Sequence, residues 1–154
     1  MQKNMATVAI SAAFLVFFLM LGGAGIAGAA EDTRSVAGVG LRMSFEGGEV
    51  LVKLYDTQAG RELVTMLPLT LSFEDYAHTE KIAYLPRKLS SGVPVSSPPA
   101  GDFTYYSPWG NLAVFYRGFG QDGSLYVLGE IESGKERLAD LNRDFTATIE
   151  VVQD

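Results

Sequence analysis

The chain has 154 residues, no cysteine, one histidine and a formal net charge of −6 at pH 7. Without cysteine there is no disulfide, thiol nucleophile or cysteine-ligated zinc. One histidine cannot make a metal site alone, and no Ser-His-Asp triad can be assembled with any specificity. An acidic chain with no cluster of Lys and Arg is also a poor candidate for nucleic acid, because binding phosphates requires such clusters. No metal, cofactor or nucleic-acid partner is therefore expected.

Residues 1–30 have the composition of an export signal. Lys3 is the only charged side chain among them, and residues 5–21 form an almost unbroken apolar run. Small residues follow this run, so cleavage after Ala29 or Ala30 is expected. The apolar run also approaches the roughly 20 residues that span a bilayer, which leaves an uncleaved membrane anchor open. We expect an exported protein, periplasmic, cell-surface or secreted, that touches a membrane only through residues 1–30 if they are retained.

Residues 31–38 lack periodicity and are expected to form a short tether to one domain at 39–154. On both sides of Gly47-Gly48, apolar residues alternate with polar ones, which predicts a β-hairpin, because both glycines can take the positive φ that a tight hairpin turn requires. The alternating apolar residues are Leu41, Met43, Phe45, Val50, Val52 and Leu54.

Two short helices are expected. Asp56 or Thr57 can cap the first, which Pro68 ends. Residues 133–136 read Ser-Gly-Lys-Glu, the Ser-x-x-Glu form of a capping box, and would open the second. The apolar positions of the two helices are Ala59, Leu63, Met66, Leu67, Leu138 and Leu141.

Further alternating segments predict strands at 69–73, 82–85, 103–106, 112–117, 125–131 and 145–151. Residues 90–101 contain only Ser, Gly, Pro, Val and Ala, and a loop of this length is usually either functional or mobile. So many short strands in one small domain favour a mainly β fold, a small closed barrel with two short helices, which also removes exposed strand edges.

Residues 105–116 join an aromatic strand end, a Pro-Trp-Gly-Asn turn and an apolar strand, and they include the only Trp. Tyr106, Trp109 and Phe115 would form a dry floor for a proline ring or another apolar group, with Asn111 fixing its orientation. Packing is the alternative, because successive strand residues face opposite sides. In that case Leu112, Val114 and Tyr116 belong to the core and Phe115 packs under a helix.

Three segments resemble the small prokaryotic cyclophilin-like proteins. They are Gly47-Gly48-Glu49-Val50, residues 79–89 (TEKIAYLPRKL) and residues 101–116 (GDFTYYSPWGNLAVFY). The resemblance covers nearly all of residues 41–151. It implies a compact cyclophilin-type β-barrel with two helices, and it is specific for the domain family rather than for an activity.

True cyclophilins are peptidyl-prolyl isomerases, so the resemblance also implies candidate residues. Residues 84–87 (Tyr-Leu-Pro-Arg) are nearest to the cyclophilin Phe-His-Arg motif, which makes Arg87 the candidate catalytic residue. Its cation would stabilise a twisted amide and lower an isomerisation barrier of about 18–20 kcal/mol. Residues 110–115 are nearest to the Gly-Ser-Gln-Phe-Phe strand but lack its glutamine, and His78 and Trp109 lie in other contexts than the cyclophilin groove residues.

The sequence therefore predicts an exported cyclophilin-like domain that binds an extended peptide or a small ligand in an aromatic groove, with catalysis not established. The predicted groove residues are Tyr84, Tyr106, Trp109, Asn111 and Phe115, beside Arg87. Two alternatives stay open. One is a weak prolyl isomerase that uses Arg87, and the other is a membrane-tethered interaction module that retains residues 1–30.

Overall fold

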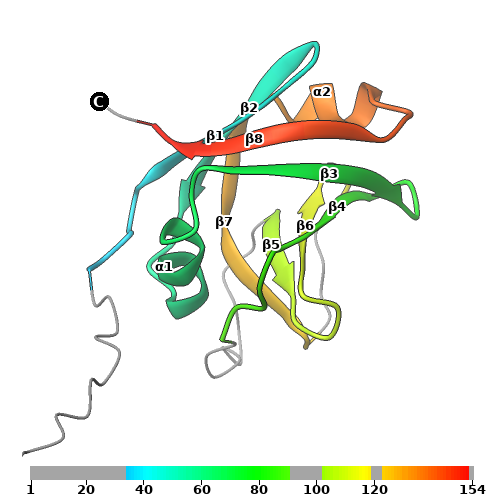
Figure 1. Ribbon diagram of the computed structural model, residues 1–154. Coiled ribbons are helices and arrows are strands. Elements are labelled where there is room, and N and C mark those ends of the chain that lie inside the picture. Colours follow the sequence, from blue (N-terminus) through cyan, green and yellow to red (C-terminus); the bar gives the residue numbers. More distant parts are fainter. Residues whose placement is uncertain (1–33, 91–101, 119–122, 153–154) are drawn as a thin grey trace, which may run out of the picture. The chain divides into compact units, whose positions relative to one another are not determined.

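The computed structural model describes residues 34–90, 102–118 and 123–152 (Figure 1). These residues form eight strands and two short helices. The strands are β1 (Gly40–Phe45), β2 (Gly48–Leu54), β3 (Leu69–Tyr76), β4 (Glu80–Tyr84), β5 (Phe103–Tyr106), β6 (Asn111–Phe115), β7 (Leu125–Ser133) and β8 (Phe145–Val151). The helices are α1 (Gln58–Val64) and α2 (Lys135–Asp140). A mainly β domain with two short helices is thus confirmed.

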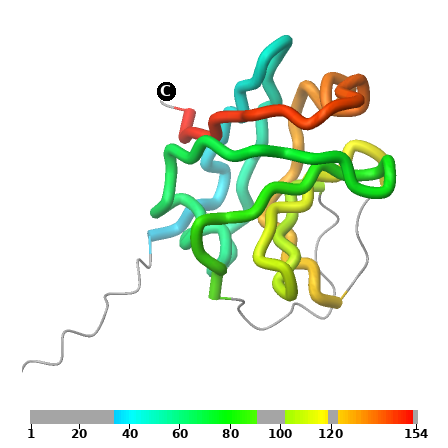
Figure 2. The backbone as a smooth tube through the Cα atoms, turned by 45° about the vertical axis from the view of Figure 1, so that its right-hand side comes forward, coloured from blue at the N-terminus to red at the C-terminus, as the bar shows by residue number. Residues whose placement is uncertain are grey.

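The strands close into one antiparallel barrel in the order β1-β2-β7-β5-β6-β4-β3-β8. Strands β3 and β8 pair along five residues each and run side by side in Figure 2. Helices α1 and α2 lie at opposite ends of the barrel in both views. Because each strand has a neighbour on both sides, the barrel leaves no strand edge open to another chain.

Strand β6 shows how alternate residues divide between the inside and the outside of the barrel. Leu112 and Val114 are fully buried in the main core cluster. Ala113 and Phe115 belong instead to a separate small cluster with Ile82. Packing is therefore the correct interpretation of the inward positions, whereas the expectation that Phe115 packs under a helix is wrong. We call the outward side of β5, β6, β4 and β3 the outer wall.

Each helix covers one end of the barrel with a buried leucine, and the two helices differ in how their N-termini are capped. Leu63 of α1 and Leu138 of α2 are fully buried. Thr57 caps α1, because its Oγ1 accepts a hydrogen bond from the Gly60 N–H at 3.0 Å. The capping box predicted for α2 is wrong. Its N-cap is Gly134 at φ 85°, where a Cβ would lie 2.2 Å from the Glu49 carbonyl oxygen.

The predicted β1–β2 hairpin is present, with one change in its turn. Phe45 pairs with Gly48, so the turn is made by Glu46 and Gly47. Only Gly47 has a positive φ, of 97°. Gly48 lies in β2, where a Cβ would come within 2.6 Å of the Arg137 side chain, so its small size rather than its φ matters.

The chain contacts the barrel before the first strand begins at Gly40. Val36, within the predicted tether, is buried, and its N–H donates to Asp56 Oδ1 at 3.2 Å. This part of residues 31–38 packs onto the barrel rather than hanging free. Residues 1–30 and 91–101, the predicted signal and most of the predicted loop, lie outside the described residues. Among the described helices, none is long and apolar enough to cross a membrane.

Candidate functional site

Three predicted site residues, Tyr84, Asn111 and Tyr106, lie side by side on adjacent strands of the outer wall. Asn111 is the cross-strand partner of Tyr84 in β4 and of Tyr106 in β5. Directly opposite residues of paired strands point to the same side. The inward positions of β6 are Leu112 and Val114, so all three of these residues face outward. Pairing that the sequence did not reveal therefore brings Tyr84 and Tyr106 to one face.

Trp109 and Tyr76 complete an aromatic surface there. The Trp109 ring lies 5.4 Å from the Tyr106 ring and 5.6 Å from the Tyr76 ring, nearly perpendicular to both. Edge-to-face contacts of this kind are favourable because a positive ring edge meets a negative ring face. Trp109 is 46% exposed, Tyr76 44% and Tyr84 56%. We call Tyr76, Tyr84, Tyr106 and Trp109 the aromatic patch.

The β5–β6 turn holds Trp109 in place. The Gly110 N–H donates to the Tyr106 carbonyl oxygen at 2.9 Å, and Gly110 has φ 77°, which a glycine adopts without strain. Lys88 crosses this turn. Its Nζ donates to the Pro108 carbonyl oxygen at 3.0 Å, and a Cβ on Gly110 would come within 2.9 Å of the Lys88 side chain. The turn is therefore fixed from within and from a neighbouring segment.

Beneath the patch the outer wall is mostly apolar, and it holds two buried acceptor atoms that no described residue satisfies. Ile82 and Ala113 are buried although they face outward. Asn111 is only 1% exposed and donates its amide N–H to the Leu112 carbonyl oxygen, and its Oδ1 has no partner in the part of the chain that the structure describes. Glu80 is half-buried on the same wall, and its buried Oε2 also has no partner among the described residues. Burial raises the pKa of the Glu80 carboxyl, because desolvation disfavours its charged form.

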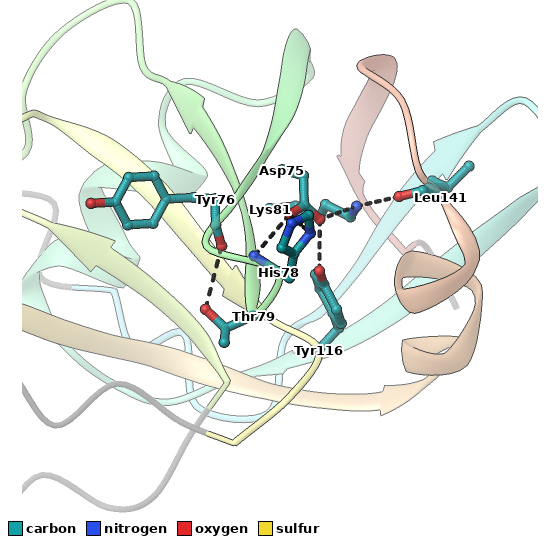
Figure 3. Close-up of polar contacts among 7 residues, drawn as sticks. All are labelled: Asp75, Tyr76, His78, Thr79, Lys81, Tyr116 and Leu141. Atoms are coloured by element: carbon teal, nitrogen blue, oxygen red, sulfur yellow. Dashed lines mark hydrogen bonds and ion pairs between the residues drawn. The ribbon is translucent and has the colours of Figure 1, made fainter.

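On the inward side of β3 and β4 lies an ionic cluster made of Asp75, Lys81, Tyr116 and the Leu141 carbonyl (Figure 3). Lys81 is completely buried, and its Nζ donates to Asp75 Oδ2 at 2.7 Å and to the Leu141 carbonyl oxygen at 2.5 Å. The Tyr116 hydroxyl donates to the same Asp75 oxygen at 2.6 Å. The ammonium also lies 4.9 Å from the centre of the Tyr116 ring. The buried lysine is thus paired with a carboxylate and hydrogen-bonded.

The ionic cluster shifts the pKa values of two of its members. Burial alone would raise the pKa of Asp75, but hydrogen bonds from Lys81 and Tyr116, the Lys81 charge and the His78 N–H together hold it below its usual value. Burial and the Asp75 carboxylate raise the pKa of Tyr116 to about 12. At neutral pH the cluster therefore holds an ionised Asp75 and a protonated Tyr116 that donates to it.

The β3–β4 turn joins the ionic cluster to the aromatic patch. Ala77 and His78 have φ values of 52° and 58°, which non-glycine residues rarely adopt. Asp75 Oδ1 accepts from the His78 N–H at 3.0 Å, and the Thr79 N–H donates to the Tyr76 carbonyl oxygen at 3.1 Å. In Figure 3 the Tyr76 ring points away from the Asp75 carboxylate. Asp75 thus holds the turn from the inward side of the barrel, while its neighbour Tyr76 belongs to the aromatic patch on the outward side.

Arg87, the predicted catalytic residue, lies against α1. Its Nη2 donates to Thr65 Oγ1 at 3.1 Å, and its Nη1 lies 3.7 Å from Glu62 Oε2. Glu62 also accepts from the Ser90 N–H at 2.7 Å. The guanidinium therefore helps to attach the segment after β4 to the helix, although half of the Arg87 side chain stays exposed.

Of the predicted site residues, the structure brings Tyr84, Tyr106 and Trp109 together on the surface and buries Asn111 and Phe115 in the wall beneath. Sequence reasoning missed Tyr76, which lies beyond the strand predicted at 69–73. The signal was present: the alternation of Leu69, Leu71 and Phe73 continues through Asp75 as the next inward position, which places Tyr76 outward. No group of three or more metal-ligating side chains occurs in the described residues.

A cavity of about 470 Å³ lies elsewhere, near the ends of β1, β2, β7 and β8. It is lined by glycine and aliphatic residues and by Glu132, the one charged side chain of the lining. None of the predicted site residues lines it. The aromatic patch is thus an open surface on the barrel wall, separate from this cavity.

Comparison with known proteins gives a family and a fold. The family described as "Cyclophilin-like family" matches residues 43–150. Among solved structures, that of the hypothetical protein AF2241 from Archaeoglobus fulgidus superposes with a TM-score of 0.60 and 19% sequence identity, over 79% of this chain and 99% of that one. At this identity the likeness concerns the fold alone. No curated protein matches the sequence.

Proposed function

The chain belongs to the cyclophilin-like family, and from this membership and its aromatic patch we propose that it is a binding module that holds an extended peptide against the outer wall of its barrel. We further propose, from the composition of residues 1–30, that it acts outside the cytoplasm.

The exposure of the patch carries this proposal. Four large hydrophobic side chains in the described part of the chain are strongly exposed, and three of them, Tyr76, Tyr84 and Trp109, belong to the patch. Scattered exposed apolar residues are ordinary, whereas a gathered group marks an interaction surface. Tyr and Trp supply contact area at a small cost in side-chain entropy and dominate binding energy at such surfaces.

The shape of the surface favours a peptide over a small molecule. The patch reaches from Tyr76 on β3, across β4 and β6, to Tyr106 on β5. Three strand spacings amount to about 14 Å, the length of roughly four extended residues. Small ligands prefer concave sites that enclose most of their surface. An open wall of this width suits an extended chain whose apolar side chains rest on the rings.

Prolyl isomerisation is the rival activity, and the contacts of Arg87 rank it second. The guanidinium is engaged by Thr65 and Glu62, and it would have to leave Glu62 uncompensated in order to reach a substrate amide. A coupled proline-peptide assay on wild type and Arg87→Ala separates the two functions. A catalysed rate that disappears in the variant would establish the isomerase, and equal rates at the uncatalysed level would exclude it.

The binding proposal is tested by titrating the protein with capped pentapeptides that differ in their central residue. Trp109 is the only tryptophan, so its fluorescence reports directly on the patch. Tyr84→Ala and Tyr76→Ala are expected to weaken binding about 2- to 10-fold each, the effect of losing one aromatic contact. Val151→Ala, which removes an exposed apolar residue outside the patch, serves as the matched control.

If neither Trp109 fluorescence nor amide chemical shifts respond to any peptide of the panel, the binding proposal fails. The mass of the mature protein tests the export proposal separately. Loss of residues 1–29 or 1–30 is the expected result. A mass that includes them in protein recovered from a membrane would support the tethered module instead.

A further inference from the structure

We infer that the peptide held on the aromatic patch carries a cationic side chain, arginine or lysine, which docks at the corner between Tyr76 and Trp109 beside Glu80. This inference rests on the proposed function and specifies the class of peptide that the patch takes.

The first observation is the arrangement of the rings. Tyr76 and Tyr106 both stand nearly perpendicular to Trp109, at 84° and 89°. Perpendicular rings form the walls of a corner, in which a group meets one ring face and a second ring at right angles. Aromatic corners of this kind bind cations, because each ring face carries the negative lobe of a quadrupole, and Trp is the strongest such partner.

The second observation is the chemistry of the wall around the corner. Glu80 is the direct cross-strand partner of Tyr76, and Glu74 faces outward opposite Ile82. Asn111, opposite Tyr84 at the other end of the same wall, is buried, and its Oδ1 has no hydrogen-bond partner among the described residues. Glu80 Oε2 and Asn111 Oδ1, the buried atoms of this wall that the described residues leave without a hydrogen-bond partner, are both acceptors. A ligand that brings a positive charge complements such a wall, and an anionic ligand does not.

The basic residues of the neighbourhood leave this corner free. Lys88 lies beyond the Tyr84 end of β4 and donates to the Pro108 carbonyl oxygen. The Arg117 guanidinium lies 5.7 Å from the centre of the Tyr116 ring, and Lys81 is paired with Asp75 on the inward side. His78 is directed at Asp75, with its Nδ1 3.3 Å from Oδ1. The carboxylates thus lie at the Tyr76 end of the patch and Lys88 lies at the other.

Desolvation of Glu80 supports this assignment. Burial raises the pKa of this carboxyl, and no cation of the described residues pairs with it. A carboxylate that is already removed from water gains more from an arriving cation than a fully solvated one does.

The experiment compares two ligands of the same shape. The acetylated and amidated pentapeptide with arginine between alanines is titrated against the same peptide with citrulline, which replaces the guanidinium by a neutral urea. Trp109 fluorescence at neutral pH and low salt reports binding. The arginine peptide is expected to bind on the order of fivefold more tightly, and the difference should shrink as salt is added.

Variants then locate the preference. Glu80→Gln and Tyr76→Leu are expected to reduce the arginine-over-citrulline ratio toward one, because the first removes the charge and the second removes a ring while keeping apolar volume. Glu136→Gln, on α2, is the matched control and should keep the ratio. Circular dichroism checks that the variants are folded.

The outcomes are distinct. Equal binding of the two peptides would overturn the cation inference and leave the binding module standing. A preference that survives in both Glu80→Gln and Tyr76→Leu would also overturn it, because the cation would then dock elsewhere. No fluorescence or amide-shift response to any pentapeptide, including the proline and leucine versions, would overturn the proposed function and this inference with it.

Discussion

Replacing Lys81 by methionine should destabilise the barrel strongly, although methionine fills a similar volume. Lys81 is completely buried between Asp75 and the Leu141 carbonyl, and its removal takes the ammonium donor and its charge away from both acceptors. Breaking a buried ion pair by removing one partner costs about 3–5 kcal/mol. Asp75 keeps part of its exposure and its hydrogen bonds from Tyr116 and His78, so we expect a loss at the lower end of this range, about 3 kcal/mol.

Urea unfolding followed by Trp109 fluorescence measures this loss, and its midpoint should fall with an unchanged slope. The double variant Lys81→Met with Asp75→Asn should lose less than the sum of the single variants, because the uncompensated charge is gone. Lys53→Met makes the same substitution at an exposed position of β2 and should change stability by less than about 0.5 kcal/mol. If Lys81→Met is as stable as Lys53→Met, the ionic cluster does not hold the barrel together as argued.

Three further predictions concern single groups. The lowered pKa of Asp75 means that its contribution to stability is present above its ordinary value of 3.8 and is lost as the pH falls below it, so Asp75→Asn should show a shallower acid limb in its stability profile. The raised pKa of Glu80 has the opposite effect on the pH dependence of stability, because its contribution falls as the pH rises past 4.5. Glu80→Gln should therefore be more stable than wild type at pH 7 and nearly as stable as wild type at pH 4. Gly134→Ala should destabilise the protein by more than about 2 kcal/mol, because it adds a clash with the Glu49 carbonyl oxygen to an unfavourable φ. Gly38→Ala, at φ 74° in open space, should cost only about 1 kcal/mol, and the urea midpoints of the two variants test this difference.

Alternation made the strands predictable because it is a local signal. The expected segments at 103–106 and 145–151 coincide with β5 and β8, and the others overlap β3, β4, β6 and β7. The strand order was not predictable in the same way. Strand β6 lies between β5 and β4, and β7 lies between β2 and β5, and these neighbours are chosen by how residues far apart in the chain pack together.

The site was predicted in part for the same reason. Tyr106 and Trp109 are close in sequence, and the turn between β5 and β6 brings them together. Their meeting with Tyr84 depends on the pairing of β4 with β6, and their meeting with Tyr76 on the pairing of β3 with β4. Asn111 and Phe115 have polar and aromatic side chains typical of a site, but the surrounding side chains bury them in the wall.

Neighbouring residues of β3 connect the stability of the barrel with its proposed function. Asp75 faces inward and is held by Lys81 and Tyr116, while Tyr76 faces outward and meets Trp109. The strained turn that follows is fastened to Asp75 through the His78 N–H, so the position of the Tyr76 ring depends on the buried charge pair behind it. Loss of Lys81 should therefore loosen the corner at which the cation is proposed to dock. In Lys81→Met, under conditions where the variant is still folded, the preference for arginine over citrulline should fall, whereas Lys53→Met should keep it.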